Sequence, residues 1–522
     1  MPTFYADSSL QEQHDRVYYT KFSGAPVLPP NIGEEEFATI ITKLKVITGD
    51  SNVITGADLS HFRDPYPLNE DEHHPSAAVC PGSVEEIRAI LDVANHHKLP
   101  LWTTSRGKNF GYGGAAPRVA GTVVLALHRM NRILEVNEKF SYVVVEPGVT
   151  FFDLQKYFDD NKVGLWCSCP ALGWGSLMGN TLDRGHGYTI NGDRQHSIKS
   201  MEVVLPNGEL LRTGQWAIID SPNAHCCANS FGPQIDGLFL QSNLGVVTKI
   251  AIEIDTAPPA YMSFAVHVPN VEHLAPLIDT YHDLLRDKVM QNQALIVNIN
   301  HFASHASQKH EYQRATGPLT PETIATLIGK FGTGYWRSIF DLYGPRSMVL
   351  ARAAIIETAI GKAVPGVRIE KHLVEGENGK PVDNKIVGTL GAGFPSMRAM
   401  SLADYDLAKG DDLPGAHIDT TLILPSNGQA VSEWFTGAHA LMESYGIDPF
   451  IGCHVLDKHV LFVQEYVFDR RQHDHRERGQ KMICALLAKA KTKGYVSYRC
   501  HLQYMGTLLM SMSKYGRINH VR

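Results

Sequence analysis

Hydrophobic residues near the start of the chain recur at the spacing of a helix with one buried face. Between residues 83 and 95 the apolar side chains follow the i, i+3, i+4, i+7 pattern, at Ile87, Ile90, Leu91 and Ala94. Ser83 precedes this run and Glu86 lies three residues further on, which is the signature of a capping box. The pattern predicts a helix over 83–95.

Shorter apolar runs around this helix predict strands. They occupy residues 99–102, 122–127 and 142–146, and a second helix is expected from about 150 to 161. Residues 201–205 and 209–212 flank the turn Pro206-Asn-Gly208, which is typical of a hairpin. This half of the chain therefore predicts an α+β fold with short strands.

The pattern changes after Ala257-Pro-Pro-Ala260, where we expect a domain boundary. Long amphipathic stretches predict helices at 271–290, 321–332, 429–445 and 476–493. Strand-like runs lie between them at 294–299 and 459–464. Because 522 residues exceed the usual size of one hydrophobic core, the chain is expected to form two α+β domains.

A glycine-rich segment joins the predicted strands 99–102 and 122–127. Its glycines let a backbone turn sharply and bring N–H groups against an anion, at Gly107, Gly111, Gly113 and Gly114. Gly111, Gly113 and Ala116 also fit the G-x-G-x-x-A dinucleotide fingerprint, but that fingerprint requires a helix to follow. Pro117 and a strand follow instead, which excludes a Rossmann site and leaves a pyrophosphate loop of another kind or a surface turn.

A second glycine cluster favours the phosphate interpretation over the surface turn. Residues 172–192 contain Gly173, Gly175, Gly179, Gly185, Gly187 and Gly192. Two such segments at strand ends would grip both sides of one extended cofactor.

Composition and charge exclude several classes of protein. Hydrophobic residues make up 43% and charged residues 20%, which is ordinary for a globular chain, and 48 Lys and Arg against 54 Asp and Glu leave no basic surface for nucleic acid. No stretch is apolar enough to span a membrane, and neither a signal peptide nor a peroxisomal address is visible, so we expect a cytoplasmic protein.

The metal-ligating residue types form no recognisable metal site. Cys167 and Cys169, like Cys226 and Cys227, are too close for a zinc ligand pair, so the eight cysteines are expected to be buried reduced thiols. The run Asp71-Glu-His-His74 could ligate a metal, but its polar neighbours favour a solvated loop. We therefore expect no metal.

Ordered motifs along most of the chain resemble the vanillyl-alcohol oxidase and 4-cresol methylhydroxylase family of flavoproteins. They include Val145-Glu-Pro-Gly-Val149, Gly179-Asn180 with Arg184-Gly-x-Gly-Tyr-Thr189, and Tyr498-Arg499-x-His501-Leu502. The segments 105–118, 201–214, 237–249 and 413–417 carry the same resemblance.

The resemblance implies FAD as cofactor and a two-domain fold of the vanillyl-alcohol oxidase type. Residues 1–258 and 496–522 would form the FAD-binding domain, and 259–495 an α+β cap. Relatives continue beyond the segment that matches 498–502, so the C-terminal part is expected to be shortened. Residues implied to contact the cofactor are Ser105, Arg106, Gly107, Lys108, Asn109, Gly111, Gly113, Gly114, Pro170, Gly173, Ser176, Gly179, Asn180, Gly185, Gly187, Val247, His417 and Arg499.

The resemblance also implies a chemistry, in which a para-substituted phenol binds as its phenolate. Tyr112, Tyr498 and Arg499 match the positions that hold the phenolate oxygen, and Tyr188 is expected at the same centre. Because a free phenol ionises near pH ~10, a guanidinium with two O–H donors would favour the anion. Hydride would then leave the benzylic carbon for flavin N5 and give a p-quinone methide.

His417 matches the position of a covalent histidyl link to FAD, a bond that would raise the reduction potential of the flavin. The family places an acidic residue beside the flavin where this chain has Ala171, which cannot activate water. Asp419, two residues after His417, is a candidate to take over that role, or else a solvent-facing residue.

The sequence leaves three alternatives open for the reaction. A flavin oxidase of another alcohol and a non-catalytic flavin-binding protein compete with the phenol oxidase. The acceptor of the electrons is either O₂, which is favoured, or a protein. The chain has no haem-attachment motif, so any haem partner would be a separate subunit. By resemblance the protein is expected to form a homodimer or a higher homo-oligomer.

Overall fold

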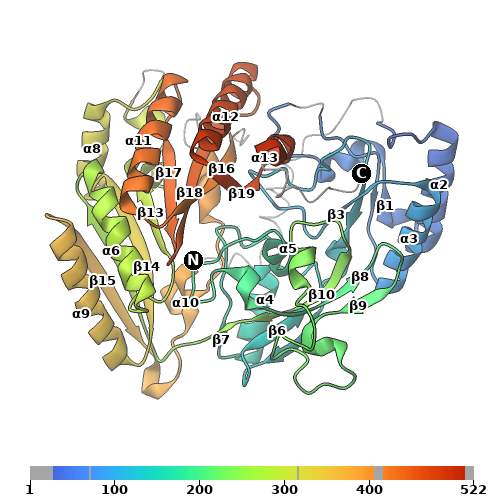
Figure 1. Ribbon diagram of the computed structural model, residues 1–522, viewed down its shortest axis with the longest axis horizontal. Coiled ribbons are helices and arrows are strands. Elements are labelled where there is room, and N and C mark those ends of the chain that lie inside the picture. The colour runs from blue at the N-terminus through green and yellow to red at the C-terminus, as the bar shows by residue number, and fades with distance from the viewer. Residues whose placement is uncertain (1–26, 70–71, 314–316, 405–414, 512–522) are drawn as a thin grey trace.

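The computed structural model describes residues 27–69, 72–313, 317–404 and 415–511. These residues form two lobes, one built on two small sheets and the other on a single large sheet (Figure 1). The expected α+β architecture in two parts is confirmed.

The first small sheet has the strand order β1-β2-β4-β3, with bounds Val53–Ile54, Ala78–Val79, Val123–Ala126 and Leu101–Thr104. Strands β2, β4 and β3 run parallel, and helices α2 (Glu34–Thr48) and α3 (Val84–His97) pack against them. The predicted helix start is confirmed, because the Ser83 hydroxyl accepts the Glu86 N–H. The Glu86 carboxylate accepts the N–H of Gly82, one residue before the one that a capping box would use.

The second small sheet is antiparallel, with the order β5-β6-β10-β8-β9. Its strands are Ile133–Asn137, Tyr142–Val145, Val246–Glu253, Ile198–Val204 and Leu210–Arg212, and β8 and β9 form the predicted hairpin. Helices α4 (Phe151–Asn161) and α5 (Leu177–Leu182) cover its apolar face. Strands β7 (Leu165–Trp166) and β11 (Asp255–Thr256) make a separate short pair.

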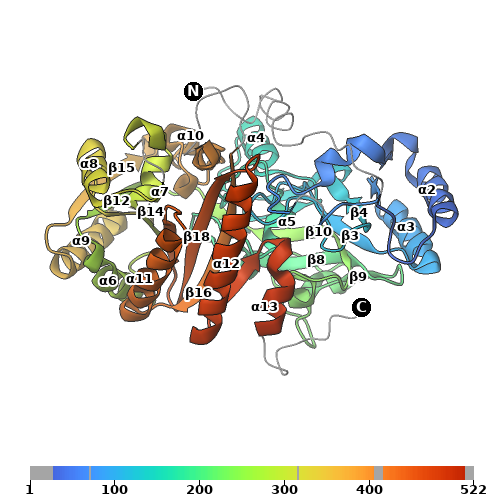
Figure 2. The same ribbon diagram turned by 90° about the horizontal axis from the view of Figure 1, so that it is seen from above.

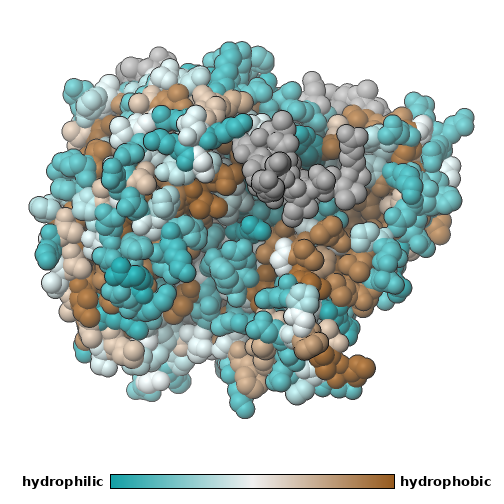
Figure 3. All heavy atoms as spheres, in the orientation of Figure 1, coloured by the Kyte–Doolittle hydropathy of each residue, from teal (hydrophilic) through white to brown (hydrophobic). Residues whose placement is uncertain are grey.

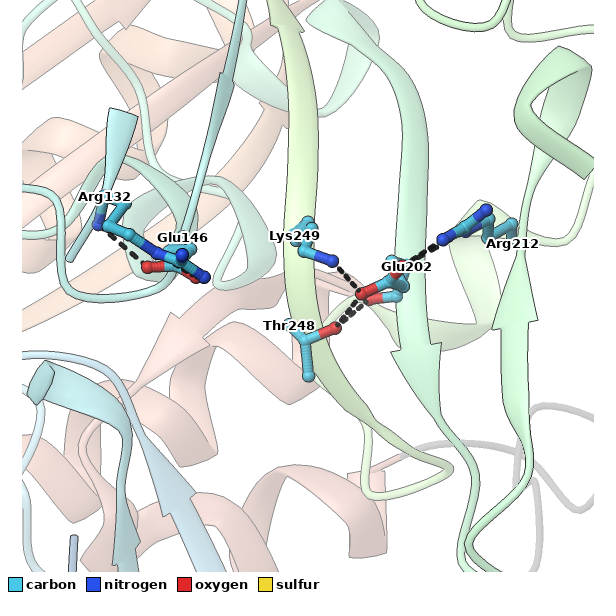
Figure 4. Close-up of polar contacts among 6 residues, drawn as sticks. All are labelled: Arg132, Glu146, Glu202, Arg212, Thr248 and Lys249. Carbon is cyan, nitrogen blue, oxygen red and sulfur yellow. Dashed lines mark hydrogen bonds and ion pairs between the residues drawn. The ribbon is translucent and has the colours of Figure 1, made fainter. Parts of the chain in front are cut away.

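A buried carboxylate joins three strands of this second sheet (Figure 4). Glu202 on β8 lies 2.9 Å from the Arg212 guanidinium on β9 and 2.7 Å from the Lys249 amine on β10. Burial works against its charge, but Lys249 and Arg212 outweigh burial and hold the pKa of Glu202 below its usual value.

The large sheet has eight antiparallel strands in the order β15-β12-β14-β13-β17-β18-β16-β19. Their bounds are Arg368–Glu375, Ala260–Val268, Trp336–Gly344, Ala294–Asn298, Phe450–Val455, His459–Asp469, Gly415–Pro425 and Val496–Cys500. Helices α6 (Leu274–Arg286), α9 (Arg346–Ala363), α11 (Gly428–Ser444) and α12 (His473–Lys493) line one face (Figure 2).

Alternation along the strands gives the two faces of this sheet different chemistry. On β16, Ile418 and Leu422 point into the apolar core under the helices. His417, Asp419 and Thr421 therefore point to the opposite face, toward the glycine-rich segments. The large sheet thus supplies polar groups to the junction of the two lobes.

The remaining helices are short or peripheral: α7 (Ile299–Ser304), α8 (Pro321–Phe331), α10 (Asn384–Val387) and α13 (Met505–Ser511). Strand β12 begins at Ala260, next to the expected boundary. Strand β19, expected to belong with the FAD-binding part, pairs with β16 of the large sheet. The domain limits at 258 and 495 remain a prediction.

Candidate active site

The first glycine segment connects the parallel strands β3 and β4 without a helix, as predicted. Gly111 and Gly113 have φ angles of +80° and +112°, which favour glycine. A Cβ on Gly113 would lie 1.9 Å from Leu502, and one on Gly111 would lie 3.0 Å from the His417 ring. Glycine is therefore required for this segment to approach β16 and the residues after β19.

The structure brings the two glycine segments together. Ser105 packs on Gly179, where a Cβ would lie 2.1 Å from the Ser105 hydroxyl oxygen. The Asn109 amide donates to the Asp183 carboxylate over 3.1 Å. Ser176 caps α5 by accepting the Gly179 N–H. The segments are thus two walls of one site.

Arg499 on β19 completes this junction. Its guanidinium lies 2.9 Å from Asp183, donates to the side-chain amide oxygen Oδ1 of Asn109 over 2.5 Å, and stacks over the Tyr112 ring at 4.1 Å. The Arg499 side chain is only 10% exposed. Burial opposes its charge, but Asp183, Tyr498 and Tyr112 raise the pKa of Arg499 above its usual value. The guanidinium therefore stays protonated.

Tyr112 and Tyr498 lie beside this cation. The Tyr112 hydroxyl is 3.4 Å from the Thr421 hydroxyl, and the Tyr498 ring meets His186 edge-on at 5.7 Å. Burial raises the pKa of both tyrosines, although Arg499 acts in the opposite direction. Both are therefore neutral O–H donors at ordinary pH, and the predicted trio is assembled.

His417 and Asp419 stand on β16 immediately behind Gly111. His417 Nε2 lies 3.9 Å from an Asp419 oxygen, and Tyr66 covers the ring at 5.1 Å. Asp419 is 12% exposed, so the solvent-facing alternative is wrong. Burial raises the pKa of the Asp419 carboxyl, and His417 and Arg499 limit the rise.

Tyr188 is held from the large-sheet side of the junction. The Asn292 amide donates to the Tyr188 carbonyl over 2.8 Å, and Gln293 donates to the Gly187 carbonyl over 2.5 Å. The Tyr188 ring lies 5.7 Å from His454 on β17. Asn292 and Gln293 therefore orient the second glycine segment.

The segment that contains Ala171 lies against the same glycines. The Ser168 hydroxyl accepts the Thr189 N–H over 3.2 Å and sits where a Cβ on Gly187 would be. Gly173 donates to the Ser396 carbonyl over 2.9 Å, and Pro170 and Ala171 are half-buried. The alanine thus lies next to the site but supplies no titratable group.

The other residues expected at the cofactor fall into two groups. The first group is half-buried and comprises Arg106, Gly107, Lys108 and Gly114 in the first segment and Asn180 in the second. Gly185 packs against that asparagine. Val247 differs, because its side chain is buried in the apolar core of the second small sheet. Only its backbone would be available to a cofactor.

Several polar atoms at the junction are buried without a partner among the described residues. They are Asn180 Oδ1, His417 Nδ1, Asp419 Oδ1 and Arg499 Nε. Buried polar groups are normally hydrogen-bonded, so this convergence fits a polar ligand. Apolar residues gather nearby on the surface over α5, β3 and β10, as an aromatic cofactor would require (Figure 3). The residues fit FAD.

Sequence reasoning missed Asp183, Asn292, Gln293 and Glu465, although Asp183 directly precedes the Arg184-Gly185 motif. It also predicted a solvated loop at 71–74, which is wrong for the histidines. His73 and His74 are both buried, since His73 contacts the Arg118 carbonyl at 3.1 Å and His74 accepts from Arg63 at 3.0 Å. Asp71 lies outside the described residues.

All eight cysteines are free, but Cys227 and Cys484 are exposed, which corrects the expectation of uniform burial. Across the ranges that the structure covers, no cluster of three or more His, Cys, Asp or Glu could hold a metal ion. Among the helices of the described part, none is long and apolar enough to cross a membrane.

Comparison with known proteins agrees with this geometry. Residues 75–214 match the model of an FAD binding domain. A solved structure of 4-ethylphenol oxidase from Gulosibacter chungangensis superposes with a TM-score of 0.87 at 30% identity, over 93% of this chain and 92% of that one. The structure of p-cresol methylhydroxylase gives 0.86 at 27% identity, over 94% of both chains. The flavoprotein subunit of 4-cresol dehydrogenase from Pseudomonas putida is 28% identical over 93% of this chain and 92% of its own length.

Proposed function

This chain belongs to the vanillyl-alcohol oxidase and 4-cresol methylhydroxylase family of FAD-dependent oxidoreductases, and from that premise we propose that it oxidises para-substituted phenols. The substrates are 4-hydroxybenzylic alcohols and 4-alkyl- or 4-allylphenols. One observation carries the proposal: a buried guanidinium, Arg499, lies 4.1 Å from the centre of the Tyr112 ring and 6.0 Å from that of Tyr498, and both tyrosines are neutral.

This trio is suited to a phenolate. Arg499 is partly compensated by Asp183, but its Nε is buried and without a partner in the described chain. An anion that accepts from Arg499, Tyr112 and Tyr498 would gain charge-assisted hydrogen bonds. The same contacts would lower the pKa of a bound phenol from its usual value near ~10. A neutral sugar or alcohol would leave the guanidinium without this anion.

FAD would supply the hydride acceptor and pass the electrons to O₂. The two glycine segments would hold it, and the half-buried Ser105 and Asn180 side chains are the groups available to its polar parts, since Asn180 Oδ1 is buried without a partner in the described chain. His417 would form the covalent link, since its Nδ1 is buried without a partner among the residues described and Gly111 gives it room.

Asp419 would take the basic role that Ala171 cannot fill. It is buried, within the electrostatic reach of Tyr112 and Arg499, and on the face of β16 that meets the glycine loop. If so, Asp419→Ala slows product formation, and Ala171→Asp in that background restores part of it. Unchanged turnover and product distribution in Asp419→Ala would refute this role.

The direct test of the activity uses paired substrates in air. We expect 4-hydroxybenzyl alcohol to give 4-hydroxybenzaldehyde and hydrogen peroxide in equal amounts. Its 4-methoxy analogue cannot form a phenolate, so it should not react. Equal rates for both substrates would favour an alcohol oxidase without phenolate recognition, and aldehyde without peroxide would favour another electron acceptor.

A further inference from the structure

A second buried carboxyl group lies directly opposite Asp419. Glu465 on β18 is its cross-strand partner, and the two side chains are 12% and 15% exposed. Directly opposed residues share a face of the sheet, with Cβ atoms about 5 Å apart. Burial disfavours the charge on both carboxyls, and the Asp419 carboxylate disfavours ionisation of Glu465 further, so a proton held by Glu465 is favoured.

Glu465 connects this pair to a histidine on a neighbouring element. His301 on α7 places its Nε2 3.0 Å from a Glu465 oxygen. Asn298 caps α7 by accepting the His301 N–H over 3.1 Å, which fixes where the helix begins. The imidazole Nδ1 is buried and has no partner within the residues that the structure describes.

A second histidine at the end of α7 extends this series of side chains to the surface. His305 follows one helical turn later, and its ring meets that of His301 edge-on at 5.0 Å. Unlike His301, the His305 residue is exposed. Asp419, Glu465, His301 and His305 therefore form a continuous row from the phenol site to solvent.

From this row we propose that Glu465 and His301 carry the substrate proton from Asp419 to solvent. The inference rests on the proposed function. When a 4-hydroxybenzyl alcohol is oxidised, the benzylic carbon loses a hydride to the flavin. The hydroxyl O–H bond breaks as the C=O bond forms, and the proton passes to the Asp419 carboxylate. It then moves to Glu465, to His301 Nε2, and from His301 Nδ1 toward His305.

The surroundings keep Glu465 protonated and His301 neutral, so the transfer is concerted, with each group gaining one proton as it releases another. His417 on the same strand faces Asp419, as do Tyr112, His501 and Arg499 from other elements. Tyr188 faces Glu465. Burial raises the pKa of the Glu465 carboxyl, and Asp419 raises it further. Burial lowers the pKa of His301, as do His305 and His454. A neutral imidazole with one acceptor and one donor nitrogen can take a proton on one side and release it on the other.

The test follows flavin absorbance and proton release together in one anaerobic turnover of 4-hydroxybenzyl alcohol, with a pH-indicator dye. In the wild-type holoenzyme we expect one proton to appear as the flavin bleaches, separate in time from the proton that the phenol loses when it binds as phenolate. In Glu465→Gln and His301→Ala, bleaching should persist while proton release slows at least tenfold. Added imidazole should restore the rate in His301→Ala alone. His301→Gln provides a second, more conservative variant.

His310→Ala is the matched control, because this exposed histidine follows the same helix outside the row. It should release its proton at the wild-type rate. Proton release at that rate in folded Glu465→Gln and His301→Gln would overturn the relay while leaving the phenol activity intact. A wild-type flavin that no phenol bleaches would overturn the proposed function itself, and the relay with it.

Discussion

Arg499 and Asp183 form an ion pair of 2.9 Å, although they lie 316 positions apart in the chain. One residue comes from the edge strand of the large sheet and the other follows α5 in the small lobe. The pair therefore fixes the Arg499 cation relative to the glycine segments that would hold FAD.

The first prediction concerns the shape of this cation. Arg499 contacts Asp183 and Asn109 while it stacks on Tyr112, which a lysine cannot reproduce because it lacks the planar fork. We expect Arg499→Lys to raise KM for a 4-alkylphenol at least tenfold. Arg499→Ala should lower kcat/KM by roughly 100-fold. This corresponds to a loss of about 3 kcal/mol in transition-state stabilisation, the size expected when a hydrogen bond to a charged group is removed. Anaerobic flavin reduction measures both, and a wild-type rate in Arg499→Ala would contradict phenolate binding at this site.

The second prediction concerns the flavin link. Acid precipitation of the wild-type protein should leave the flavin in the pellet, and His417→Ala should release it into the supernatant. Because a covalent link raises the reduction potential, the variant should also be reduced more slowly by the same phenol. Tyr66 contacts the same ring without a reactive nitrogen, so Tyr66→Phe is the matched control and should retain the link. Release of all flavin from the wild type would contradict the assignment.

A third prediction concerns Glu202, the carboxylate that joins β8, β9 and β10. Glu202→Gln leaves Lys249 and Arg212 without their partner, and we expect a loss of about 3 kcal/mol in the free energy of unfolding. Exposed Glu433→Gln should change it by less than about 0.5 kcal/mol. The pKa of Glu202 is lower in the folded state than in the unfolded state. Its contribution to the free energy of unfolding is therefore present above the unfolded-state pKa and is lost as the pH falls through the folded-state pKa. Denaturant unfolding at pH 7 and pH 4 measures this difference.

Asp341 gives the opposite pH dependence. This buried carboxyl accepts from Tyr261 and from Asn292, and burial raises its pKa to about 7. Because the pKa of Asp341 is higher in the folded state, its contribution to stability is fully present below the unfolded-state pKa near 3.8. That contribution is lost as the pH rises through the folded-state pKa of about 7. We expect Asp341→Asn to lessen the fall in Tm between pH 5 and pH 8. An unchanged slope would show that Asp341 ionises at its usual pKa.

Local patterns predicted much of the fold because many elements carry their own signals. The helix at 84–97 has both an apolar stripe and a cap, and the β8–β9 hairpin has its turn residues. Helix α9 was missed, since its apolar residues surround the axis instead of forming one stripe. Strands β12, β14 and β15 lack turn signals between them and are defined by pairing across the sheet.

The same difference between local signals and distant contacts applies to the candidate site. The glycine segments, Tyr112, Arg499 and Asp419 could be predicted because each lies in a short motif or next to one. Asp183 and Glu465 could not, because their roles arise from contacts with Arg499, His301 and the partner strand. Those contacts join residues that are distant in sequence, and no local spacing encodes them.

One anaerobic experiment tests phenol oxidation most directly. The purified yellow protein is mixed with vanillyl alcohol or a 4-alkylphenol while the flavin absorption band is followed. Bleaching of the band, with none for the matching methyl ether, is the result that a phenolate held by Arg499, Tyr112 and Tyr498 predicts. A bound flavin that remains oxidised across a panel of para-substituted phenols would contradict it.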